Sequence, residues 1–249
     1  MIDRPYVTLS SATSLDGYLD RADPPRLALS NDADFDRIDE LRTGNDAILV
    51  GARTIRRDNP RLLVRSIARQ TRRENAGLAR SPWKVTVTAS GDLDPWAAFF
   101  TTGDTTRLVY CPGSIAERLR RRLGRSAVVV GLGNGVTMAD LVADLADRGI
   151  GRLMVEGGGT VHTQFLAADL VDELQLAVAP FFVGDQRAPR FVGDAAFPWT
   201  STHRASLADV QQVGDMVVLR YALSHRFAWH DDERTGQIVS PKSLVLGLS

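Results

Sequence analysis

The segment VEGGGTVHTQFL, residues 155–166, decides the fold class. Its apolar start continues residues 153–154 and predicts a buried strand, and a helix is predicted to follow the glycines through about Ala167. Glycines at 157–159 would let a diphosphate approach the backbone, and the helix N-terminus would supply free N–H groups for it. The alternative is a tight turn whose backbone needs positive φ, and this segment alone favours neither interpretation.

A second turn of the same kind lies in DAILVGARTIRRDNPRLLVR, residues 46–65. An apolar run ends at Gly51 and predicts a strand buried on both faces, followed by a helix. Arg53, Arg56 and Arg57 provide cations of the kind that a phosphate needs, although a solvated helix surface is the commoner explanation for each arginine alone. Two such turns in one parallel sheet predict a nucleotide lying across the carboxyl ends of the strands.

Strands and helices alternate through most of the chain. We predict further strands at 6–10, 85–88, 107–110 and 127–130, the last as a central strand, and helices at 31–43, 114–123 (capped by Ser114) and 137–148. The arginine-rich stretch 65–82 has weak periodicity and predicts a surface loop. After residue 173 the apolar period becomes two, and a hairpin is predicted around Val213-Gly214-Asp215. The fold class is therefore α/β, with a mostly parallel central sheet, antiparallel C-terminal strands and helices on both faces.

The 249 residues show no internal repeat and no linker. We predict one domain over residues 1–224, because the periodic pattern continues to about that point. Residues 225–249 lose the pattern and are predicted to form a C-terminal tail or extension, with a short apolar element at 243–246.

Composition excludes several classes of protein. Lysine plus arginine and aspartate plus glutamate each number 30, so the chain has no net charge to attract nucleic acid or an anionic membrane. No stretch approaches the ~18 apolar residues of a membrane span, and the first residues lack the order of a signal peptide. The single cysteine, Cys111, fits a reducing compartment. We therefore expect a cytoplasmic protein, and the dispersed histidines predict no metal site.

The predicted helix 31–43 carries an arginine on its apolar face. At 100° per residue, Ile38 and Leu41 fall on the same side as Asp34 and Arg42. A guanidinium on an inward face needs a partner, which could be a ligand phosphate or a salt bridge to Asp34. His162, in the helix after the three glycines, is interpreted as packed or solvent-facing rather than catalytic.

Three segments together resemble a known family: SLDG at 14–17, TIRRDNPRL at 54–62 and EGG at 156–158. They are similar to the C-terminal reductase domain of the bifunctional riboflavin-biosynthesis deaminase–reductase, which has a dihydrofolate-reductase-like fold. The resemblance extends over about residues 5–223. That family uses NADPH to reduce the ribosyl group of 5-amino-6-(5-phosphoribosylamino)uracil, so the resemblance implies an NADPH-dependent reductase in riboflavin biosynthesis. The zinc signature of the deaminase half is absent from the sequence.

The resemblance also implies roles for individual residues. Thr54, Asp58, Gly158, Gly159 and Thr160 match cofactor contacts, and Gly51, Arg53 and Gly157 join them from the two turns. Arg42, Leu62, Arg65 and Glu156 match the substrate side, where the arginines suit a phosphate. Glu156 and Asp16 are the candidate catalytic groups, although closing a turn is the commoner explanation for Asp16.

Two departures from the family pattern keep other functions open. Many members carry a lysine where this chain has Ser10, and a tryptophan often stands near the position of Ala28. One alternative is a dihydrofolate or pterin reductase of the same fold, in which Asp34 would supply the carboxylate. The other alternative is a non-catalytic nucleotide-binding protein.

A homodimer is also expected, because related reductases pair through their sheets. Leu174, Leu176 and Val178 form an apolar row that could line such an interface. The alternative is that this row faces the chain's own core.

Overall fold

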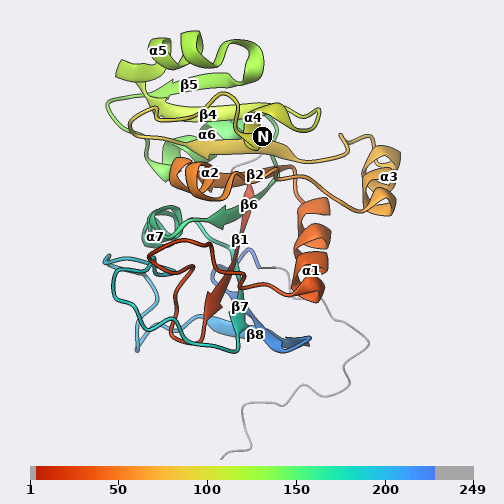
Figure 1. Ribbon diagram of the computed structural model, residues 1–249, viewed down its shortest axis with the longest axis vertical. Helices are drawn as coiled ribbons and strands as arrows, with labels where there is room; N and C mark the ends of the chain where they lie inside the picture. The colour runs from red at the N-terminus through yellow and green to blue at the C-terminus, as the bar shows by residue number, and fades with distance from the viewer. Residues whose placement is uncertain (1–3, 228–249) are drawn as a thin grey trace, which may run out of the picture.

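One sheet organises the chain, and the computed structural model describes residues 4–227 of it (Figure 1). Nine strands within these residues lie in the order β5-β4-β3-β2-β6-β1-β7-β9-β8. Their bounds are β1 Tyr6–Ser14, β2 Ala47–Gly51, β3 Trp83–Val87, β4 Arg107–Pro112, β5 Val128–Leu132, β6 Arg152–Gly157, β7 Glu173–Ala179, β8 Ser206–Val213 and β9 Met216–Ala222. Strands β1 to β7 pair in parallel, and β9 is antiparallel to both β7 and β8. The predicted element at 243–246 lies outside the described residues.

Helices cover both faces of the sheet, as predicted. The helices are α1 Asp32–Thr43, α2 Ala52–Asp58, α3 Ile67–Asn75, α4 Ala98–Thr101, α5 Gly113–Leu123, α6 Met138–Asp147 and α7 Gly159–Ala167. Apolar residues of α6 and α7 form the core on one face, and those of α1, α2, α4 and α5 form the core on the other. No helix among residues 4–227 is both long and apolar enough to cross a membrane.

Local signals placed most boundaries correctly. The Asn31 side chain accepts a hydrogen bond from the Asp34 amide and caps α1, which ends at Thr43 as predicted. The predicted hairpin is formed by β8 and β9, with Gly214 at φ +65° in the turn. Ser114, by contrast, does not cap α5: that helix begins at Gly113 and has no side-chain cap.

Two predictions about the sheet and its surroundings were wrong. The valine-rich strand β5 lies at the edge of the sheet rather than at its centre, and Val128 is exposed. Residues 67–75 form helix α3 rather than a loop. The buried residue of α3 is Arg73, whose guanidinium donates to the carbonyls of Thr43, Asn45 and Ala79. Because the buried side of this helix is not apolar, its sequence lacks the periodicity from which a helix is predicted.

The last strands leave one apolar face open. Leu174 packs against the main core, as the alternative interpretation expected, but Leu176 and Val178 are only half-buried. Leu176 and Val178 lie opposite Leu219 and Val217 of β9, and the same face of the sheet extends onto β8. The open face of β7, β9 and β8 consists of Leu176, Val178, Leu207, Val210, Val217 and Leu219, of which Leu207, Val210 and Val217 are exposed.

The carboxylate of Asp172 joins the two ends of the described chain. Asp172 is fully buried and accepts two hydrogen bonds of 2.7 Å from the guanidinium of Arg4. It also accepts from the Val7 amide, the Ser224 hydroxyl and the Arg226 guanidinium. One buried charge therefore holds β1, β7 and the segment after β9 together.

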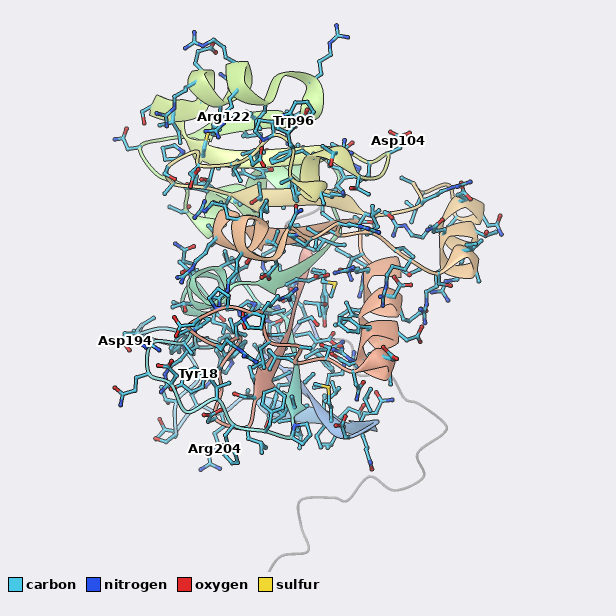
Figure 2. All side chains as sticks on the ribbon, viewed as in Figure 1. Tyr18, Trp96, Asp104, Arg122, Asp194 and Arg204 are labelled. Carbon is cyan, nitrogen blue, oxygen red and sulfur yellow. The ribbon has the colours of Figure 1, made fainter. Side chains whose placement is uncertain are left out.

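We expect Asp172→Asn to lower the free energy of unfolding by about 3 kcal/mol, because an amide cannot satisfy two arginines in a buried site. Asp104→Asn is the matched control, since Asp104 is exposed and points away from the sheet in Figure 2. The control should change stability by less than about 0.5 kcal/mol. Chemical denaturation measures both variants, and equal midpoints would contradict the role of Asp172.

Candidate active site

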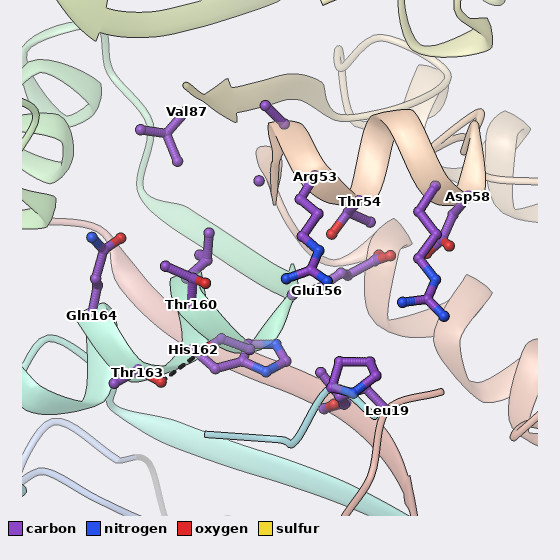
Figure 3. A pocket seen from close by; sticks show the side chains of 18 of the residues that line it. Leu19, Arg53, Thr54, Asp58, Val87, Glu156, Thr160, His162, Thr163 and Gln164 are labelled. Carbon is purple, nitrogen blue, oxygen red and sulfur yellow. Dashed lines mark hydrogen bonds between the residues drawn. The ribbon is translucent and has the colours of Figure 1, made fainter. Parts of the chain in front are cut away.

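A cleft of about 1330 Å³ lies at the carboxyl ends of the parallel strands (Figure 3). Helices α1, α2 and α7 and the loops near residues 26–30, 87–90 and 189–194 form its walls. Both turns singled out in the sequence open into it. This is where an open α/β sheet binds its ligands.

The turn between β6 and α7 needs its glycines for two reasons. Gly157 has φ +127°, and the peptide bond between Gly157 and Gly158 is cis. A Cβ on Gly159 would overlap the Arg190 carbonyl oxygen of the loop that crosses this turn. Gly158, Gly159 and Thr160 line the cleft, whereas Gly157 does not. The positive-φ interpretation therefore holds at Gly157 alone, whereas Gly159 is required by the close approach of the Arg190 carbonyl. The first N–H groups of α7 remain available at the cleft wall.

The α2 side places four predicted cofactor residues on the cleft wall: Gly51, Arg53, Thr54 and Asp58. Burial raises the pKa of Asp58, although Arg26 at 3.4 Å opposes the shift.

The three arginines of this turn differ in their partners. Arg56 donates to the Asp92 carbonyl at 2.7 Å, and Arg57 pairs with Asp20 at 3.0 Å. Arg53 is exposed and has no ion pair within residues 4–227. Of the three cations, Arg53 is therefore the one still available to a ligand.

Arg42 and Glu156 form a two-point ion pair on the cleft wall. Arg42 Nε and Nη2 donate to the two carboxylate oxygens of Glu156, each at 2.7 Å, and Nη1 donates to the Leu63 carbonyl at 3.1 Å. Burial alone would lower the pKa of Arg42, but the charge and hydrogen bonds of Glu156 raise it above its ordinary value. Both residues line the cleft. The prediction that a salt bridge satisfies Arg42 is correct, but the partner is Glu156 rather than Asp34.

Arg65 also lines the cleft and is more exposed than Arg42. Its side chain is 59% exposed, donates to the Phe35 carbonyl at 2.9 Å and lies over the Phe35 ring. Leu62, predicted beside it, is buried in the core at φ +50° and does not line the cleft.

Asp16 also lies outside the cleft lining. Its carboxylate accepts hydrogen bonds from the Ser14 hydroxyl and from the amides of Val183 and Gly184. Partial burial would raise its pKa, but these bonds lower it to about 2. Closing the turn accounts for this residue, and the structure does not bring it to the other candidate groups.

The residues behind the alternative functions are also placed. Asp34 is fully buried, pairs with Arg37 at 2.8 Å and does not line the cleft. Ser10 and Ala28, the two departures from the family pattern, do line it.

His162 lines the cleft, which its sequence context did not indicate. The side chain is buried rather than solvent-facing, yet it lines the cleft, and Nδ1 lies 3.2 Å from the Phe191 carbonyl oxygen. Burial lowers its pKa to about 4, against a smaller opposing effect of the Phe191 hydrogen bond. Its spacing from Phe165 and Leu166, three and four residues on, was the signal that placed it on the inward face.

The sheet order and the position of the cleft define a dihydrofolate-reductase-like α/β protein. The model of the RibD C-terminal domain matches residues 5–219, and the chain belongs to that family.

Curated proteins from three organisms are similar to the chain over most of its length. The chain is 30% identical over 225 residues to the 2,5-diamino-6-ribosylamino-4(3H)-pyrimidinone 5′-phosphate reductase of Archaeoglobus fulgidus, covering 90% of this chain and 99% of that protein. It is 31% identical over 221 residues to the enzyme of the same name from Methanothermobacter thermautotrophicus, covering 88% and 99%. It is 27% identical to the riboflavin biosynthesis protein RibD of Bacillus amyloliquefaciens, covering 78% of this chain and 50% of that protein.

Solved structures agree on the fold. RibD of Acinetobacter baumannii superposes with a TM-score of 0.72 at 25% identity, over 88% of this chain and 58% of that chain. The chain therefore spans little more than half of that protein. A pyrimidine reductase-like protein from Corynebacterium diphtheriae superposes with a TM-score of 0.73 at 22% identity, over 88% and 91%.

Proposed function

We propose that this chain is an NADPH-dependent reductase of a phosphorylated ribosylaminopyrimidine in riboflavin biosynthesis. The observation that carries the proposal is the cleft of a RibD C-terminal domain whose lining holds both the α7 turn and the charged residues Arg42, Glu156 and Arg65. The sequence favoured 5-amino-6-(5-phosphoribosylamino)uracil. The archaeal relatives are named for the 2,5-diamino compound, which shares the phosphorylated ribosylamino group. Parallel assays with both compounds identify the preferred one.

The residues present fit a dinucleotide phosphate. The first N–H groups of α7 suit its diphosphate, and Gly158 leaves room for a close approach of the backbone. Thr54 and Asp58 offer a hydroxyl and a carboxyl for hydroxyl groups of the cofactor. When bound, NADPH supplies the hydride that converts the ribosyl group of the substrate into a ribityl group.

At the substrate end, the chain provides position and charge. Because both oxygens of Glu156 already accept from Arg42, we propose that the pair acts as one rigid group against the substrate. Arg65, whose side chain is 59% exposed and whose Nε lies 3.9 Å from Asp39 Oδ1, is the candidate for the 5′-phosphate.

The alternatives have less support. A pterin reductase would need the Asp34 carboxylate in the cleft, but that group is buried against Arg37. A purely binding protein would not need the Arg42–Glu156 ion pair on the cleft wall.

We further propose that residues 1–224 form the reductase domain and that the chain works in the cytoplasm. The last described strand ends at Ala222, and Cys111 is a buried free thiol, which suits a reducing compartment.

The cofactor prediction concerns Arg53. Arg53→Ala should weaken NADPH binding about tenfold or more and leave NADH nearly unchanged, because only NADPH carries the extra phosphate. Arg122→Ala on α5 is the control, since Arg122 is exposed and does not line the cleft. Fluorescence titration gives both dissociation constants. Equal affinity of the unaltered protein for the two cofactors would remove the argument for NADPH.

The substrate prediction concerns Arg65. Arg65→Ala should weaken the phosphorylated substrate roughly ten- to a hundredfold, because it removes a charge-assisted hydrogen bond, and should spare NADPH. The dephosphorylated analogue and the exposed neighbour variant Arg61→Ala serve as controls. Weaker NADPH binding would instead assign Arg65 to the cofactor. No effect on either ligand would favour a substrate without phosphate.

We also propose a homodimer through the open face of β7, β9 and β8. Three large apolar side chains are exposed there beside half-buried ones, which is unusual for a surface without a partner. Val210→Lys should shift the chain to a monomer in sedimentation at micromolar concentration. Gln211→Lys, on the opposite face of the same strand, should not. A monomeric unaltered chain would contradict the proposal.

A further inference from the structure

His162 has one ring nitrogen that no group of the chain satisfies. Nε2 is buried and has no hydrogen-bond partner among the described residues. The ring packs on Phe191, with 5.2 Å between the ring centroids, and its other edge faces Gly157, where a Cβ would lie 3.3 Å from Nε2. A buried polar atom without a partner costs free energy, so a ligand that provides one would bind more tightly.

The partner of Nδ1 determines what Nε2 can do. A backbone carbonyl only accepts hydrogen bonds, so the contact with the Phe191 oxygen places the proton on Nδ1. A neutral imidazole carries a single ring proton, and Nε2 is then a lone-pair acceptor. The depressed pKa of His162 keeps the ring neutral near pH 7. The matching ligand group is therefore an N–H or O–H donor.

The surroundings of His162 indicate which part of a ligand provides this hydrogen-bond donor. Gly157 directly follows Glu156, which belongs to the substrate end. Leu19, which lines the cleft just after β1, donates its amide to the Pro189 carbonyl of the loop that also holds Phe191. In Figure 3 the His162 ring points away from α7 in the direction of Leu19. His162 thus lies on the β1 side of the α7 turn, whereas residues 134–136 line the cleft toward β5.

We infer that His162 Nε2 accepts a hydrogen bond from the nicotinamide ribonucleotide half of the cofactor, from its carboxamide or a ribose hydroxyl. This inference rests on the proposed function. With the diphosphate at the start of α7, the half of the dinucleotide that carries the hydride reaches toward Glu156, and Gly157, which follows Glu156 in β6, faces the His162 ring. The residue positions the cofactor and takes no part in proton transfer.

Two substitutions separate this role from a structural one. His162→Asn keeps a donor near the position of Nδ1 and removes the acceptor at Nε2. His162→Gln places a carbonyl near Nε2 and removes the donor to Phe191. We expect H162N to weaken NADPH about tenfold and H162Q to stay within about threefold of the unaltered protein. The ligand 2′,5′-ADP, which lacks the nicotinamide half, should bind equally to all three.

The opposite ranking, with H162N unchanged and H162Q weakened, would show that His162 only anchors the loop at Phe191. An equal loss of 2′,5′-ADP affinity in H162N would overturn the assignment to the nicotinamide half. If the unaltered protein did not bind NADPH, the proposed function itself would fail. If the unaltered protein bound NADPH and H162N bound it equally well, the inference about His162 would be wrong but the proposed function would stand.

The 3-acetylpyridine analogue of NADPH distinguishes the two donors, because it has no carboxamide N–H. A carboxamide donor predicts equal binding of the analogue to the unaltered protein and H162N. A ribose donor predicts that the tenfold difference persists.

Nuclear magnetic resonance of the unaltered protein gives a readout that needs no variant. With ¹⁵N-labelled histidine, one ring should show the Nδ1–H form, and NADPH should shift its Nε2 resonance upfield. An Nε2–H form, or an unmoved resonance at saturating NADPH, would overturn the inference.

Discussion

The carboxyl end of β6 imposes the constraint on which the cleft depends. The register between β2 and β6 shifts here, and the contacts show that Glu156 faces Arg42 of α1 while Gly157 faces His162 of α7. On the first face, the Glu156 carboxylate fixes Arg42 and with it the inner side of α1. On the second face, the missing side chain leaves room for His162. Two adjacent residues of one central strand therefore shape both sides of the cleft.

Charge in the cleft is mostly satisfied by the protein itself. Arg42 is paired with Glu156, Arg57 with Asp20 and Arg26 with Asp58. Paired groups hold the walls in place and contribute little attraction for an anion. The remaining arginines of the cleft are more open: Arg53 and Arg190 are exposed and have no ion pair within residues 4–227, and Arg65 has only a long contact of 3.9 Å with Asp39. These cations are the ones left to attract the phosphate groups of a ligand.

The sequence predicted what depends on neighbours along the chain. The cap at Asn31, the glycine turns and the C-terminal hairpin follow from local residue types. Helix α3 was missed because Arg73 anchors it through carbonyl groups, and β5 was misplaced because a valine run does not tell an edge strand from a central one. The partner of Arg42 lies 114 residues away, and such a pair has no local signature. The hydrogen-bond partners of Asp16 had no local signature either, since its amide donors come from 183–184.

The position of β1 has a consequence for biosynthesis. Both strands that pair with β1 come from the second half of the chain, at residues 152–157 and 173–179. A ribosome that adds about 5–20 residues per second therefore releases β1 many seconds before either neighbour exists. The early segments β2 to β5 can meet first, since they pair in sequence order. Strand β1 is thus synthesised first but gains its neighbours β6 and β7 late. During that interval its apolar residues depend on chaperones or on transient contacts for protection.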